Sequence, residues 1–87
     1  MKENFREQFR NLNTIILSNV DTLKGLISQS KSLSEIINQL GDKEENTEIK
    51  KALEETQTNI SSSIEKLTQQ TQKLFEVYNK LIDQVFG

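Results

Sequence analysis

Residues 37–49 read INQLGDKEENTEI, and this stretch decides the fold because it interrupts a pattern that otherwise fills the chain. On both sides of Gly41, apolar residues recur every three then four positions. A spacing of about 3.5 residues places them on one stripe of a helix, as in coiled coils and helical bundles. Glycine suits the residue just beyond a helix C-terminus, where a left-handed backbone is needed. The sequence therefore predicts an all-α antiparallel hairpin of two long helices.

The predicted hairpin forms one helical domain over residues 1–87. We expect the first helix over about 3–40, the turn over 41–47 and the second helix over about 46–86. The chain has no proline, which agrees with two uninterrupted helices. Asp42, Asn46 and Thr47 are candidate N-caps for the second helix, and Asp42 with Glu45 could form a capping box. The sequence leaves open whether Asp42 or Asn46 is the cap.

The stripe residues are the candidate binding site, since a helix meets other helices along its apolar stripe. The predicted turn residue is Gly41. The predicted core or partner interface consists of Leu12, Ile16, Asn19, Leu23, Leu26, Leu33, Ile37, Ile49, Leu53, Ile60, Ile64, Leu67, Leu74, Tyr78 and Leu81. The same stripe also passes through Phe5, Phe9, Ser30, Leu40, Thr56, Thr71 and Val85.

Polar residues interrupt the stripe. In a hairpin folded at about residue 44, Asn19 lies roughly level with Gln70 and Thr71, and Ser30 roughly level with Asn59 and Ile60. Polar layers of this kind cost stability but set register and partner choice in coiled coils. The alternative interpretation, equally weighted, is a loose core that admits water.

The apolar stripe is wider than one partner helix covers. It widens through Ile15, Val20, Ile27 and Ile36 in the first helix and through Phe75, Val77 and Ile82 in the second. This width suits a three- or four-helix bundle better than a lone pair. We therefore expect a further protein helix as partner, from a longer parent chain, a second copy or a different protein, and we expect the chain not to be monomeric.

Composition argues against most other functions. The net charge is −2, with basic and acidic residues interspersed, so a nucleic-acid partner is not expected. Cysteine and histidine are absent, and the carboxylates cluster on solvated helix surface. We expect no enzymatic activity, cofactor, metal or small-molecule substrate. No apolar run approaches the roughly 20 residues of a membrane span, so a cytoplasmic protein that meets membranes only indirectly is expected.

The segment from Leu23 to about Leu67 resembles the N-terminal regulatory domain of syntaxins of the endosomal and vacuolar branch. In that family the first helix ends in a leucine-glycine pair, as in residues 37–41 here, and a short polar loop follows, as in residues 42–47. Residues 48 and 49 (Glu-Ile), the basic pair 50–51 and Leu53 also match the family's second helix. Thr56 and Ile60 fall where the family has similar residues.

The resemblance implies a role in SNARE assembly and vesicle fusion, at the periphery of endomembranes. Syntaxins add a third helix, a SNARE helix and a membrane anchor, so the resemblance implies a truncated domain or a reduced protein. The family's loop usually contains proline, which is absent here.

Two alternatives stay open. Small two-helix partners or chaperones of bacterial type VII secretion, cytosolic or exported, have a similar length and a mid-chain glycine turn. Their Trp-x-Gly turn has Gln39 at the tryptophan position, and their tyrosine export signal is not matched after Tyr78. Another helical assembly subunit is the third possibility.

Overall fold

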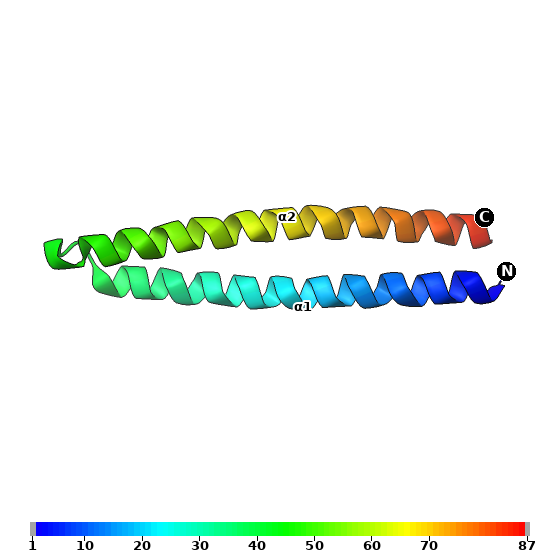
Figure 1. The fold of residues 1–87 in the computed structure, drawn as a ribbon, viewed down its shortest axis with the longest axis horizontal. Helices are drawn as coiled ribbons and strands as arrows, with labels where there is room; N and C mark the ends of the chain where they lie inside the picture. The colour runs from blue at the N-terminus through cyan, green and yellow to red at the C-terminus, as the bar shows by residue number, and fades with distance from the viewer. Residues whose placement is uncertain (1, 87) are drawn as a thin grey trace.

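The computed structural model describes the backbone of residues 2–86 and the side chains of residues 4–86. Two long helices, α1 (Lys2–Leu40) and α2 (Thr47–Phe86), run antiparallel, with a short 3-10 helix η1 (Glu44–Asn46) between them. Both chain ends therefore lie at the same end of the molecule (Figure 1). The predicted all-α hairpin is confirmed.

The hairpin is a rod, measuring 65 × 15 × 14 Å. Its radius of gyration is 19.5 Å, whereas a compact domain of this length has about 12 Å. The rod has no second layer among residues 2–86, so every side chain that does not face the other helix faces solvent.

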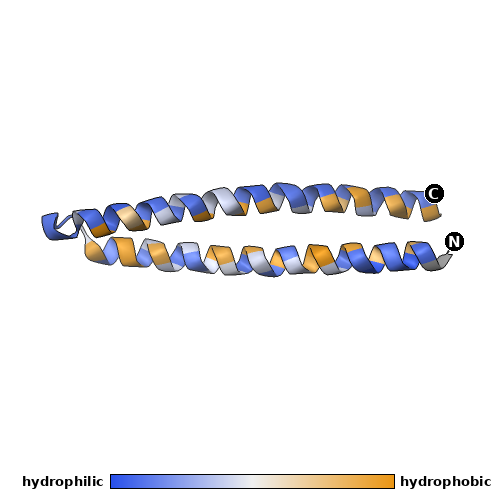
Figure 2. Cartoon of the chain, in the orientation of Figure 1, coloured by the Kyte–Doolittle hydropathy of each residue, from blue (hydrophilic) through white to orange (hydrophobic). Residues whose placement is uncertain are grey.

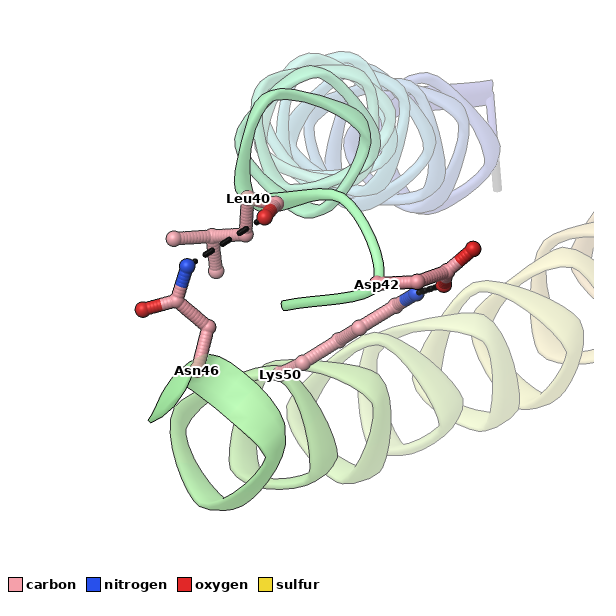
Figure 3. A network of polar contacts seen from close by, with 4 residues as sticks. All are labelled: Leu40, Asp42, Asn46 and Lys50. Atoms are coloured by element: carbon pink, nitrogen blue, oxygen red, sulfur yellow. Dashed lines mark hydrogen bonds and ion pairs between the residues drawn. The ribbon is translucent and has the colours of Figure 1, made fainter. Parts of the chain in front are cut away.

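The turn is held by three local features. Gly41 has φ +63°, the left-handed backbone that ends α1. The Asn46 side-chain amide donates to the Leu40 carbonyl oxygen over 3.2 Å, which caps the C-terminus of α1. Lys50 Nζ lies 2.9 Å from Asp42 Oδ1 and pairs the loop with the first turn of α2 (Figure 3). Asp42 and Asn46, the two candidates between which the sequence did not decide, thus bond elsewhere, and among the described side chains no capping-box bond joins Asp42 and Glu45.

We call the line along which α1 and α2 touch the seam. Figure 2 shows apolar residues on the sides of the two helices that face each other. Near the termini, the rings of Phe9 and Tyr78 meet edge to face with centroids 5.3 Å apart, an arrangement that contributes about 1 kcal/mol beyond its buried area. The seam residues of α1 are Phe5, Phe9, Leu12, Ile16, Asn19, Leu23, Leu26, Ser30, Leu33, Ile37 and Leu40, each buried or half-buried.

Two polar contacts cross the seam. Asn19 Nδ2 donates to Thr71 Oγ1 over 3.2 Å, and Thr71 Oγ1 donates in turn to the Leu67 carbonyl oxygen over 2.7 Å. The predicted level of Asn19 with Thr71 is confirmed. Nearer the turn, the Gln57 amide donates to the hydroxyl of Ser34 and, over 3.4 Å, to the carbonyl oxygen of Ser30. Counted from the Asn19–Thr71 contact, Ser30 lies level with residue 60, as predicted, and the long Gln57 side chain reaches its carbonyl oxygen from the neighbouring turn.

The first two turns of α2 differ from the predicted stripe. Ile49 is 55% exposed and Thr56 is exposed, while Lys50 and Gln57 take their places in the seam. The physical reason is helical phase, since an unbroken three-four alternation leads back from Leu53 to Lys50. The predicted positions required two successive steps of four residues, from Thr56 to residue 60 and on to residue 64, which rotate the stripe away from α1.

Candidate interaction surface

The seam is too thin to bury the apolar side chains of this chain. Ile16, at 5% exposure, is the one apolar side chain that is buried in the described part, and Thr71 is equally buried. The molecule exposes 7030 Å². A compact monomer of this mass exposes about 5,200 Å², so the rod leaves an excess of about 1,800 Å². The candidate functional site is therefore the surface beside the seam.

The predicted interface residues, with one exception, line the seam and are half-buried or buried. The exception is Ile49, which lies outside it. Lys50 and Gln57 belong to the seam and were missed, although the alternation counted back from Ile64 would have found both. Their alkyl and amide groups fill positions that an apolar pattern does not mark.

Helical spacing assigns the remaining apolar side chains to two sides of the rod. Antiparallel helices are related by a twofold axis perpendicular to the plane that contains them, so equivalent positions share a side. Residues that directly precede a seam residue lie on one side of the rod. Gln29 precedes Ser30 in α1 and Thr56 precedes Gln57 in α2, and Gln29 and Thr56 line the same groove. Residues that directly follow a seam residue lie on the other side, where Arg6 and Phe86 line a groove at the termini.

The side formed by residues that directly follow a seam residue, here called the Ile27 face, is apolar from the termini to just past the middle of the rod. Ile27 and Phe75 are 44% and 47% exposed there, and Val20 and Ile82 are half-buried. The face extends to Leu17 and continues into the groove at the termini, which is lined by Phe5, Arg6, Phe9, Val85 and Phe86. The Ile27 face is therefore a continuous apolar surface on which another helix fits.

The side formed by residues that directly precede a seam residue, here called the Ile36 face, carries apolar residues in two separate patches. Ile15 and Val77 lie near the termini, and Ile36 and Ile49 lie near the turn. The positions between the two patches, each directly before a seam residue, are polar: Thr22, Gln29, Thr56, Ser63 and Gln70. This face is therefore less suited to a continuous helix contact.

Charged residues border the Ile27 face differently on its two edges. Arg10, Lys24 and Lys31 follow seam residues of α1 at intervals of seven or fourteen residues. On α2 the equivalent positions carry Lys51 near the turn and Glu65, which follows the seam residue Ile64, near the middle of the rod. Within residues 4–86 the only ion pair joins the turn to α2, so these charges are not paired with one another within the hairpin.

The ion pair between Asp42 and Lys50 shifts the pKa of both of its members. The hydrogen bond from Lys50, and then its positive charge, lowers the pKa of Asp42, and the same contact raises the pKa of Lys50. Asp42 is exposed and Lys50 is half-buried, and their pairing explains both shifts. Nothing in the described side chains brings three carboxylate, thiol or imidazole groups together as a metal site would.

Neither α1 nor α2 contains an apolar stretch long enough to cross a lipid bilayer. No family model, curated protein or solved structure matches this chain. The resemblance to syntaxins therefore rests on the residues around the turn, and the role in SNARE assembly stays a prediction.

Proposed function

We propose that this chain is a non-enzymatic protein–protein interaction module, a helical hairpin that packs against a further helix to complete a three- or four-helix bundle. The observation that carries the proposal is the contrast between one buried apolar side chain, Ile16, and the row of large apolar side chains left at 40% exposure or more on both sides of the seam. A monomeric protein rarely exposes a continuous apolar surface of this extent without using it for binding.

Energetics support the same conclusion. A side chain stabilises a fold roughly in proportion to the apolar area that it removes from water. Most seam residues of this hairpin remain partly exposed to solvent. Two long helices that meet along a single narrow seam gain only a few kcal/mol of net folding free energy. A third or fourth helix would bury both the seam edges and the flanking residues.

Two biological settings for such a module come from the sequence. One is the regulatory bundle of SNARE assembly that the turn resembles, and the other is a two-helix partner in bacterial type VII secretion. The hairpin of about 40-residue helices is compatible with each, and the interaction module is the function common to both.

The proposal is tested by circular dichroism and sedimentation equilibrium on the whole chain between about 1 and 300 μM. If a further helix completes the fold, the chain associates as concentration rises, or it is only partly helical until a partner is added. A fully helical monomer of 10.0 kDa over the whole range, with a cooperative thermal transition, would overturn the proposal.

A further inference from the structure

We propose that a second copy of this chain docks on the Ile27 face, with α1 of each copy lying over α2 of the other. The inference rests on the proposed function and specifies its partner, its face and its orientation. The product is an antiparallel four-helix bundle whose new core is the apolar part of the Ile27 face, from the termini to just past the middle of the rod, contributed by both copies.

The choice of face follows from the distribution of apolar surface. On the Ile27 face, Val20, Ile27, Phe75 and Ile82 occupy positions next to the seam from the termini to just past the middle of the rod, with Asn13 and Thr68 at the equivalent positions between them. When the Ile27 faces of two copies meet about a twofold axis, the contact is apolar throughout only if the apolar part of one copy lies on the apolar part of the other. A twofold axis parallel to the helices does this without displacing one rod along the other, because each residue keeps its level along the rod.

The orientation follows from the charges that border the face. A twofold axis parallel to the rod places α1 over the partner's α2, whereas an axis across the rod places α1 over the partner's α1. In the second arrangement the basic edge of Arg10, Lys24 and Lys31 meets its own copy, and like charges repel. In the first arrangement the basic edge meets the edge that carries Glu65.

The register of the hairpin places opposite charges at the same level in that arrangement. Asn19 lies opposite Thr71, so Lys24, five residues further along α1, lies level with residue 66 of α2. Glu65 is next to that position and on the edge that faces α1 of the second copy. Twofold symmetry forms this pair twice. The charge pattern therefore favours one of the two possible dimers.

The exposed area of the rod is compatible with a dimer. Over both of its sides and its whole length the rod exposes about 1,800 Å² more than a compact chain of its mass, and each partner of a standard interface contributes about 800 Å². A contact along half of a 65 Å rod, with apolar residues at its centre and charges at its edges, has the anatomy of such an interface.

A matched pair of variants tests the face. Ile27→Gln and Ile36→Gln change the same residue type in the same helix, at 44% exposure in each case, and the two sites lie on opposite sides of the rod. We expect Ile27→Gln to raise the dimer dissociation constant about tenfold or more, because the change acts in both copies, and Ile36→Gln to leave it within about threefold. The reverse order, or equal effects, would overturn the choice of face.

A charge exchange tests the orientation. Lys24→Glu and Glu65→Lys are expected to weaken the dimer by about threefold or more each at low salt, and the double variant to restore wild-type affinity. Both sites are exposed, so neither change should disturb the hairpin itself. A tighter dimer for Lys24→Glu would show that α1 lies over α1, and would overturn the proposed orientation.

Wild-type sedimentation separates this inference from the proposed function. A dimer sensitive at Ile27 supports both. A partly helical monomer that does not associate overturns the second copy as partner but leaves the interaction module standing. A fully helical monomer overturns both.

Discussion

The hydrogen bond between Asn19 and Thr71 predicts the effect of removing one hydroxyl group. Thr71→Val keeps the shape of the side chain but removes the oxygen that accepts the bond from Asn19 Nδ2. The Leu67 carbonyl oxygen loses the hydrogen bond from the Thr71 hydroxyl but keeps its backbone hydrogen bond, because Leu67 lies inside helix α2. Asn19 is half-buried, so water replaces part of the lost bond, and we expect a loss of about 1 kcal/mol in the free energy of unfolding.

The double variant with Asn19→Leu shows whether the loss comes from that bond. Asn19→Leu alone loses the same bond but gains about 1 kcal/mol from half-burial of leucine, so its net effect is near zero. The double variant should be more stable than Thr71→Val by at least about 1 kcal/mol, with a coupling of about 1 kcal/mol between the sites. Breaking the polar layer should also permit more than one oligomeric state.

The assay is thermal unfolding followed by circular dichroism, at one fixed protein concentration because association shifts the midpoint. A change of 1 kcal/mol corresponds to about 4–8 °C for a domain of this size. Thr68→Val is the matched control, since the Thr68 hydroxyl donates to the Ile64 carbonyl oxygen within α2 and crosses no seam. Strictly additive effects of Asn19→Leu and Thr71→Val would refute the reasoning, as would equal losses for Thr68→Val and Thr71→Val.

Three further predictions concern single sites. Gly41→Ala should lower the free energy of unfolding by about 1–2 kcal/mol, because the φ of +63° at this position strains any side chain. Gly25→Ala should raise it by about 0.5–1 kcal/mol, because Gly25 lies in a helix with open space for a Cβ atom. Chemical denaturation of both variants measures the two changes. Ile16→Ala should cost about 2–5 kcal/mol in urea unfolding, and Leu33→Ala, which is only half-buried, should cost less; equal losses would show that the seam is covered in solution. Asp42→Asn should lower the free energy of unfolding at pH 7 but not near pH 2. A carboxylate whose pKa is lowered on folding contributes stability above its unfolded pKa and loses that contribution as the pH falls through its folded pKa. A difference in stability between wild type and variant that stays constant with pH would contradict this.

The sequence by itself determined the hairpin and its register near the middle. Apolar spacing of 3.5 residues admits one helical stripe, and a glycine between two such stripes admits one reversal, because no other residue takes a left-handed backbone at so low a cost. From that reversal, simple counting placed Asn19 opposite Thr71, and the hydrogen bond confirms it. These features depend on local geometry, which the chain carries in its residue order.

Only the tertiary structure decided how the turn closes, whereas the places of Lys50 and Gln57 in the seam also follow from counting back from Ile64. The 3-10 helix before α2 and the Asn46 side chain bonded to α1 set the phase of the second helix. That phase turns Ile49 out to solvent and Lys50 in, against their hydrophobicity. The sequence does not fix the rotation of one helix about its axis relative to the other across a turn. Each φ and ψ angle in the loop rotates the whole of the helix that follows. Which side of the rod carries the continuous apolar surface likewise follows from that rotation.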